Sequence, residues 1–181
     1  MKIKLNLLFS LFFAMLFFSA CIKDTDFDQT DDILVTPVLE LDFLLFNLNS
    51  ESFTDHGVNN LILSDTTYFE FLSEDFVSDN LIRAEIFFKY TNSLPVEFIT
   101  EYKFLDENNN SQYEINISVG EGTVASPLIV EHTENIEGDD IISLTSAEKV
   151  VVNILASNPV DNLEGDLKLQ SKTTYYLIIE Q

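Results

Sequence analysis

The chain has 181 residues, with 9 basic against 31 acidic side chains, and a formal net charge of −22 at pH 7. A surface this acidic repels nucleic acids and anionic lipid head groups, and so few cations cannot form the basic stripe that nucleic-acid binding requires. Nucleic-acid-binding proteins are therefore excluded, and an acidic, solvated surface is expected.

The N-terminus has the three parts of a secretory signal. Lys2 and Lys4 precede an apolar run of 12 residues, 7–18, that only Ser10 interrupts. The small residues Ser19 and Ala20 then precede Cys21, the only cysteine of the chain. This pattern predicts cleavage between Ala20 and Cys21 and a mature protein that begins at Cys21.

This segment resembles the signal of bacterial lipoproteins, in which the cysteine after the cut is lipidated. The resemblance implies that Cys21 carries the lipid, although Phe18 stands where the family more often has Leu, Val or Ala. The alternative is an uncleaved signal anchor, because residues 5–22 reach the lower length limit for spanning a bilayer. The domain is tethered to a membrane in both cases.

Residues 21–36 predict a flexible acidic tether, because they cannot bury enough apolar surface to fold. Lys23-Asp24 is similar to the surface-export signal of Bacteroidota lipoproteins, with Thr25 interrupting the paired acids. The whole chain also resembles small envelope lipoproteins of that phylum. These resemblances imply an outer-membrane location, lipid-anchored and surface-exposed, with a periplasm-facing lipoprotein as the alternative.

Residues 37–181 predict one all-β domain after the signal peptide 1–20 and the tether. Alternating apolar segments separated by Asn, Asp, Gly and Pro are typical of a single antiparallel β-sandwich of the immunoglobulin or fibronectin-III kind. Strands are expected at 38–48, 67–72, 81–91, 96–105, 112–119, 127–133, 149–155, 167–170 and 173–180, with helical turns within 73–80 and near 139–144. Residues 90–95 are similar to a stretch of late-embryogenesis-abundant type 2 and fibronectin-III-like sandwiches, which supplies no active site.

Two adjacent strands predict a hairpin in one register. If Leu105 faces Gln112, then Phe104 faces Tyr113 and Tyr102 faces Ile115 on one side, while Lys103 faces Glu114 on the other. Because the apolar and the charged faces are both satisfied, this register is expected. In the strand at 81–91, the side chains expected on one face are those of Ile82, Ala84, Ile86, Phe88 and Tyr90.

No arrangement of residues predicts catalysis or a cofactor. The two histidines, His56 in a loop and His132 at the end of a strand, lack the activated serine and Gly-x-Ser-x-Gly turn of a hydrolase. Neither His-Glu-x-x-His nor Cys-x-x-Cys is present to bind zinc. With Cys21 lipidated, no cysteine remains for a disulfide. We therefore predict a protein that is not an enzyme and has no catalytic, cofactor or metal site.

Calcium and glycans stay open as ligands. Residues 106–110 offer oxygens to Ca²⁺, but hairpin loops use the same residue types for backbone reasons. The acids at 24, 26 and 28 do not form an EF-hand, because Gln29 and Val35 stand where Gly and Glu are required. The absence of Trp disfavours a flat platform for sugars, and Tyr175-Tyr176 should place one ring on each face of the last strand. Asp65-Thr66-Thr67 resembles the O-glycosylation acceptor of Bacteroidota.

These observations predict a non-enzymatic outer-membrane lipoprotein with a binding or assembly role at the cell envelope. Its partners would be the membrane, through the lipid, and an envelope protein contacted by the loops at 49–60 or 106–111. One alternative is a carbohydrate-binding or uptake accessory lipoprotein. The other, less favoured, is an envelope hydrolase.

Overall fold

The computed structural model describes residues 34–55, 58–59, 61–68, 72, 74–160 and 162–180. The signal sequence, Cys21 with its cleavage site after Ala20, and His56 lie outside the described residues. Strand β1 (Leu34–Val35) lies within the last residues assigned to the tether, and it forms a two-stranded sheet with β12 (Ile179–Glu180).

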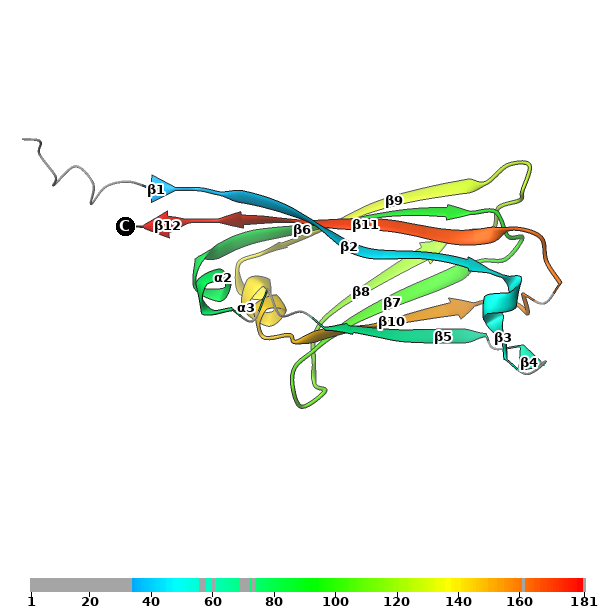
Figure 1. Ribbon diagram of the computed structural model, residues 1–181, viewed down its shortest axis with the longest axis horizontal. Coiled ribbons are helices and arrows are strands. Elements are labelled where there is room, and N and C mark those ends of the chain that lie inside the picture. The colour runs from blue at the N-terminus through cyan, green and yellow to red at the C-terminus, as the bar shows by residue number, and fades with distance from the viewer. Residues whose placement is uncertain are drawn as a thin grey trace, which may run out of the picture. The chain divides into compact units, whose positions relative to one another are not determined.

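Two antiparallel sheets of four strands make up the domain (Figure 1). The first, here called the β2 sheet, has the order β2 (Val38–Asn49), β11 (Asp166–Leu177), β6 (Leu81–Asn92) and β9 (Leu128–Glu137). The second, the β5 sheet, has the order β5 (Ile62–Tyr68), β10 (Lys149–Ala156), β7 (Phe98–Leu105) and β8 (Ser111–Val119). The 3-10 helix η2 (Ser50–Phe53) and a small hairpin of β3 (Thr54–Asp55) and β4 (Val58–Asn59) follow β2.

The strand pairing is nested, and it defines a jelly roll. β7 pairs with β8, β6 with β9, β5 with β10 and β2 with β11, so the chain is one long hairpin folded over into two sheets. The predicted antiparallel sandwich is confirmed. Its strand order is that of the jelly roll rather than of the immunoglobulin or fibronectin-III sandwiches, in which the first and last strands of the domain are not paired in this nested way.

Several predicted boundaries are wrong. β5 begins at Ile62 and ends at Tyr68, where a strand was expected at 67–72, and β9 continues to Glu137. The two strands expected at 167–170 and 173–180 are one strand, β11. It stays continuous because Ser171 is buried at a bulge, where its hydroxyl bonds both the amide nitrogen and the carbonyl oxygen of Leu44 at 2.8 Å.

The predicted hairpin register is confirmed. Phe104 faces Tyr113, Lys103 faces Glu114, and only the end differs, because Leu105 faces Ser111 instead of Gln112. The expectation that Ile82 shares a face with Ala84, Ile86, Phe88 and Tyr90 is wrong. The register of β6 against β11 shifts between Leu81 and Arg83, so Leu81 is 6% exposed and Ile82 is 49% exposed.

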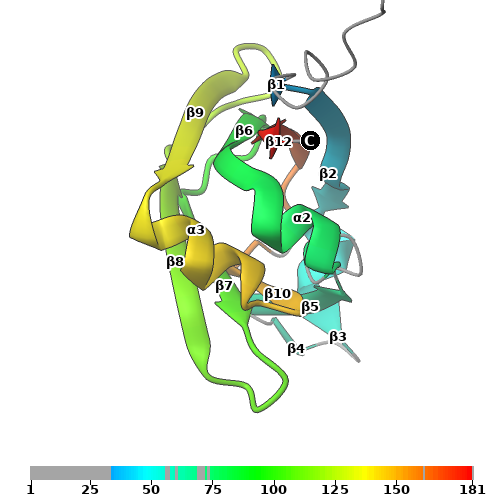
Figure 2. The same cartoon turned by 90° about the vertical axis from the view of Figure 1, so that its left-hand side faces the viewer.

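The core lies between the sheets and is rich in aromatic rings. Phe88 and Tyr90 of β6 face Tyr102 and Phe104 of β7, and the ring centroids of Phe88 and Tyr102 are 4.7 Å apart. Burying each such ring stabilises the fold by roughly 1.5–3 kcal/mol. Two short helices, α2 (Asp75–Asn80) and α3 (Asp139–Thr145), lie across one end of the sandwich (Figure 2) and bury Val77, Ile141 and Leu144. Both helices were expected from the sequence.

The connection from β6 to β7 crosses from one sheet to the other. Asn92 is fully buried there, and its side-chain amide donates to the carbonyl oxygens of Val96 and Gly120, both at 2.8 Å. Its side-chain oxygen accepts a hydrogen bond from the backbone of Leu94 at 2.9 Å. Gly122 packs so closely that a Cβ atom would lie 1.8 Å from the carbonyl oxygen of Asn92. One side chain and one glycine therefore hold this crossover in place.

Candidate binding site between two sheet edges

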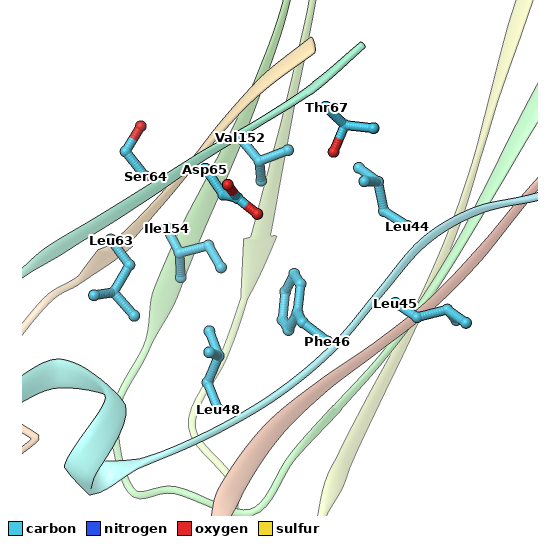
Figure 3. A pocket seen from close by; sticks show the side chains of 10 residues that line it. All are labelled: Leu44, Leu45, Phe46, Leu48, Leu63, Ser64, Asp65, Thr67, Val152 and Ile154. Atoms are coloured by element: carbon cyan, nitrogen blue, oxygen red, sulfur yellow. The ribbon is translucent and has the colours of Figure 1, made fainter. Parts of the chain in front are cut away.

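A pocket opens where an edge strand of each sheet borders the core. β2 is an edge strand of one sheet, and β5 is an edge strand of the other. The pocket between them has a volume of about 150 Å³ (Figure 3). Its walls come from β2, β5 and β10: Leu44, Leu45, Phe46, Leu48, Leu63, Ser64, Asp65, Thr67, Val152 and Ile154.

Asp65 occupies a core-facing position of β5. In the register of β5 against β10, Asp65 lies opposite the buried Val152, and Leu63 lies opposite the buried Ile154. Because side chains alternate between the faces of a strand, Leu63 and Asp65 both face the β2 sheet. Figure 3 shows the Asp65 carboxylate directed into the pocket among apolar side chains.

The Asp65 carboxylate remains exposed to solvent and has no ion-pair partner among the residues that the structure describes. One of its oxygens accepts a hydrogen bond from the backbone amide of Thr66 at 2.8 Å. An inward-pointing charge on an edge strand also hinders pairing with the edge of another copy. The pocket therefore combines apolar walls with a single anionic acceptor.

The surroundings of the pocket are apolar and acidic. Leu45 is 64% exposed, Ile62 57% and Leu61 43%. Neither β2 nor β5 contains a basic residue, whereas they carry Glu40, Asp42 and Asp65, of which Glu40 pairs with Lys172 of β11 at 2.6 Å. A ligand for this edge would therefore have an apolar part and a positive charge or a hydrogen-bond donor.

The opposite edge of the sandwich is closed by a polar link. The Tyr113 hydroxyl of β8 donates to Glu134 of β9 at 2.6 Å, and the other Glu134 oxygen lies 3.0 Å from Nε2 of His132. Burial, followed by the Glu134 carboxylate, raises the pKa of Tyr113. His132 was expected at a strand end beside Glu131, but it lies within β9, on the core-facing side opposite Phe88.

The loop at 106–110 uses its carboxylate internally. Asp106 accepts hydrogen bonds from the backbone amides of Asn108 and Asn110 and from the side chains of Asn110 and Gln112, at 2.8–3.0 Å. These donors, Asn110 first, lower the pKa of Asp106. Within the described ranges, no group of three or more His, Cys, Asp and Glu side chains is arranged to hold a metal ion.

The structure also shows the positions of the tyrosine pair and the threonine that the sequence singled out. Tyr175 is buried and Tyr176 lies on the outer face, as expected, with the Arg83 guanidinium 4.5 Å from its ring centre. Thr66, of the acceptor-like tripeptide, is exposed on β5. No helix within the described part of the chain has the length and apolar character needed to cross a membrane.

The pocket was not predicted, because the strand expected at 67–72 begins five residues earlier, at Ile62. With a strand expected at 67–72, residues 62–66 were assigned to no strand, so the face on which Asp65 lies was not predicted. The alternation of Leu63, Asp65 and Thr67 with the exposed residues between them was the signal that could have identified the inward carboxylate.

The strand order places the chain among jelly-roll β-sandwich proteins. No protein-family model matches the chain, and no curated protein matches its sequence. Solved structures that match in part include a candidate secreted protein from Parabacteroides distasonis, with 18% identity and a TM-score of 0.45 over 63% of this chain and 37% of that one. The VP2 subviral particle of infectious bursal disease virus matches with 9% identity and a TM-score of 0.39, over 83% and 33% of the two chains. Desmodium yellow mottle tymovirus matches with 9% identity and a TM-score of 0.34, over 82% and 90%.

The chain thus spans well under two thirds of the Parabacteroides and VP2 chains. Likenesses of this size carry no argument about activity.

Proposed function

We propose that this protein is a non-enzymatic lipoprotein of the outer membrane, whose jelly roll binds a partner at the pocket between β2 and β5. The anchor rests on the sequence pattern that ends at Cys21. Two or three acyl chains would hold the protein stably in a bilayer, because each buried methylene contributes about 0.8 kcal/mol.

The observation that carries the binding role is the open apolar pocket with one inward carboxylate. A cavity of this volume lined by Leu, Ile and Phe can hold a benzene-sized group. Exposed apolar side chains mark interaction sites where they gather in one place, and Leu45, which lines the pocket, is 64% exposed. The pocket between β2 and β5 is a better candidate for binding a partner than the loop at 106–110, because the Asp106 carboxylate already accepts hydrogen bonds from within that loop.

Site-specific photo-crosslinking in intact cells tests this function. A photoreactive amino acid replaces Leu45 at the pocket, and in a matched control it replaces Ile99, an exposed apolar residue of the central strand β7. The proposal predicts a discrete adduct from position 45, absent from position 99 and lost when Leu48→Arg obstructs the pocket. Equal labelling at both positions, or none at position 45, would contradict it.

A glycan ligand is the second candidate, and one observation favours it. Tyr68, at the end of β5, is 70% exposed on the outer face, where Ser64, Thr66 and Asn153 also lie. The Lys149 ammonium lies 5.8 Å from the ring centre, and the exposed part of the ring could stack on a sugar. Binding to a glycan array that Tyr68→Ala abolishes and Asp65→Asn leaves intact would favour this candidate over the pocket.

A further inference from the structure

The free edge of β5 offers a template for another strand. β5 pairs with β10 over its full length, from Ile62 opposite Leu155 to Tyr68 opposite Lys149. In the described part of the sheet, no strand pairs with its other side. The backbone N–H and C=O groups along a free edge can hydrogen-bond an extended peptide, and pockets beside the edge then select its side chains.

The pocket and Asp65 would meet alternate side chains of such a peptide. A strand added to β5 directs every second side chain toward the core side, which is the side that Leu63 and Asp65 share. One of these side chains would enter the apolar pocket, between Leu63 and Leu48. The next one on that face, two residues along, would lie near the Asp65 carboxylate.

The negative charge of the protein distinguishes between two candidates for the added strand, a second copy of this chain and a segment of another protein. A second copy of this chain would bring a net charge of −22 against another −22, and no basic residue from its own β2 or β5. A segment with a lysine or arginine is instead attracted by the acidic surface and can pair with Asp65.

We propose that the binding partner is an extended protein segment that adds to the β5 edge, with one large apolar side chain in the pocket and a Lys or Arg two residues away on Asp65. This inference rests on the proposed function and specifies its partner. Main-chain hydrogen bonds would supply affinity, and the alternating apolar and basic side chains would supply specificity.

Fluorescence anisotropy with defined peptides tests the proposal on the mature lipoprotein in detergent. The probes are labelled peptides of sequence Ser-Thr-Phe-Thr-Lys-Thr-Ser and Ser-Thr-Lys-Thr-Phe-Thr-Ser, because a strand running in either direction can reach both the pocket and the carboxylate. Control peptides replace Phe by Ser or Lys by Glu. At least one probe should bind, and each control should bind at least about tenfold more weakly, which corresponds to about 1.4 kcal/mol.

Variants of the exposed Asp65 are expected to fold, and they make the test specific. Asp65→Asn should weaken the lysine peptide about tenfold, and Asp65→Lys should instead prefer the glutamate peptide. Glu114→Gln is the matched control, since Glu114 is an exposed carboxylate on the outer face of β8, at the other edge of the same sheet. It should leave binding unchanged.

Hydrogen exchange identifies the strand edge that binds the peptide. Peptide binding should slow the exchange of amides in residues 62–68 and leave those of β8 unchanged. Protection of β2 alone, binding that ignores the Phe and Lys positions, or unchanged affinity of the Asp65→Lys variant would each overturn the inference. A dimer whose formation competes with the peptide for this edge would also overturn it, in favour of a second copy.

Different results would contradict the proposed binding function and the strand-addition inference. If neither peptide binds while position 45 still crosslinks to a partner in cells, the strand-addition inference is wrong and the binding function stands. If position 45 captures nothing in cells, the proposed function itself is contradicted, whatever the peptides do.

Discussion

The hydroxyl groups of Tyr90 and Tyr102 hydrogen-bond to each other across the middle of the core. Tyr90 comes from β6 in the β2 sheet and Tyr102 from β7 in the β5 sheet, and both side chains are fully buried. This bond is a polar connection between the two layers within a core that is mainly apolar. It fixes one sheet laterally against the other.

Removing one of these hydroxyls should therefore be costly. Tyr102→Phe leaves the Tyr90 hydroxyl buried without this partner, and an unsatisfied buried group costs about 1–3 kcal/mol. Urea denaturation should show this loss in the free energy of unfolding, with an unchanged m-value. The Tyr90→Phe/Tyr102→Phe double variant should lose less than the sum of the single variants. Strict additivity would show that the two hydroxyls are not coupled.

The same pair predicts a loss of stability at high pH. Burial raises the pKa of Tyr90 from its ordinary value of 10.0 to about 12, and burial together with Tyr90 raises the pKa of Tyr102 as well. The folded state then retains protons that the unfolded state releases, so the stabilising effect is complete below pH 10 and declines as the pH rises toward 12. Unfolding free energies measured from pH 9 to pH 11 should fall, and the double Phe variant should show a shallower decline.

The crossover from β6 to β7 should be among the least tolerant places in the chain. Asn92→Ala removes three hydrogen bonds and leaves two carbonyl oxygens and one amide without that partner, at an expected cost of about 3 kcal/mol or more. Thermal unfolding followed by circular dichroism measures the loss. An Asn92→Ala protein as stable as the parent would contradict this account.

Two glycines provide a matched comparison at the same crossover. Gly122→Ala should be strongly destabilising, because its Cβ would meet the backbone of Asn92. Gly120→Ala should be much milder, because its nearest neighbour is the end of the Leu128 side chain at 3.2 Å. Equal melting temperatures for the two variants would show that the close approach at Gly122 is not required.

Asp65 should reveal a conflict between stability and solubility. Asp65→Val places an apolar side chain among Val152, Leu63 and Phe46, so the melting temperature should rise. It also removes the charge that keeps the β5 edge from pairing with another copy. Sedimentation should therefore show concentration-dependent association, which Thr66→Val on the outer face should not cause.

Cys21 should decide where the protein resides. Cys21→Ser removes the proposed lipidation site, so metabolic labelling with a fatty acid should be lost and the protein should leave the outer-membrane fraction. Ser19→Ala keeps a small residue before the cut and should remain labelled. A Cys21→Ser protein that stays in the membrane fraction would favour the uncleaved signal anchor.

The face of a strand on which each side chain lies could be predicted from the sequence better than the sheet to which each strand belongs. The β7–β8 register followed from alternation, because Tyr113, Ile115 and their partners are apolar on one side and charged on the other. Alternation does not specify which sheet a strand joins, so the strands expected at 81–91 and 96–105 gave no sign that the connection at Asn92 crosses from one sheet to the other. Ser171 ended a predicted strand because a buried hydroxyl bonded to a distant backbone leaves no local pattern. Asp65 was not recognised as facing the core because the strand that carries it was expected at 67–72 and begins at Ile62.

The nested pairing has a consequence for the order in which the protein can be completed. β11 lies between β2 and β6 and is the last long strand of the chain. Until it emerges, β2 has no neighbour in its sheet, and the apolar side chains on its core-facing side remain uncovered. The sandwich therefore cannot close until β11 has been synthesised. If the protein is exported unfolded, as the proposed lipoprotein signal implies, this late closure would help to keep the chain unfolded until it has crossed the membrane.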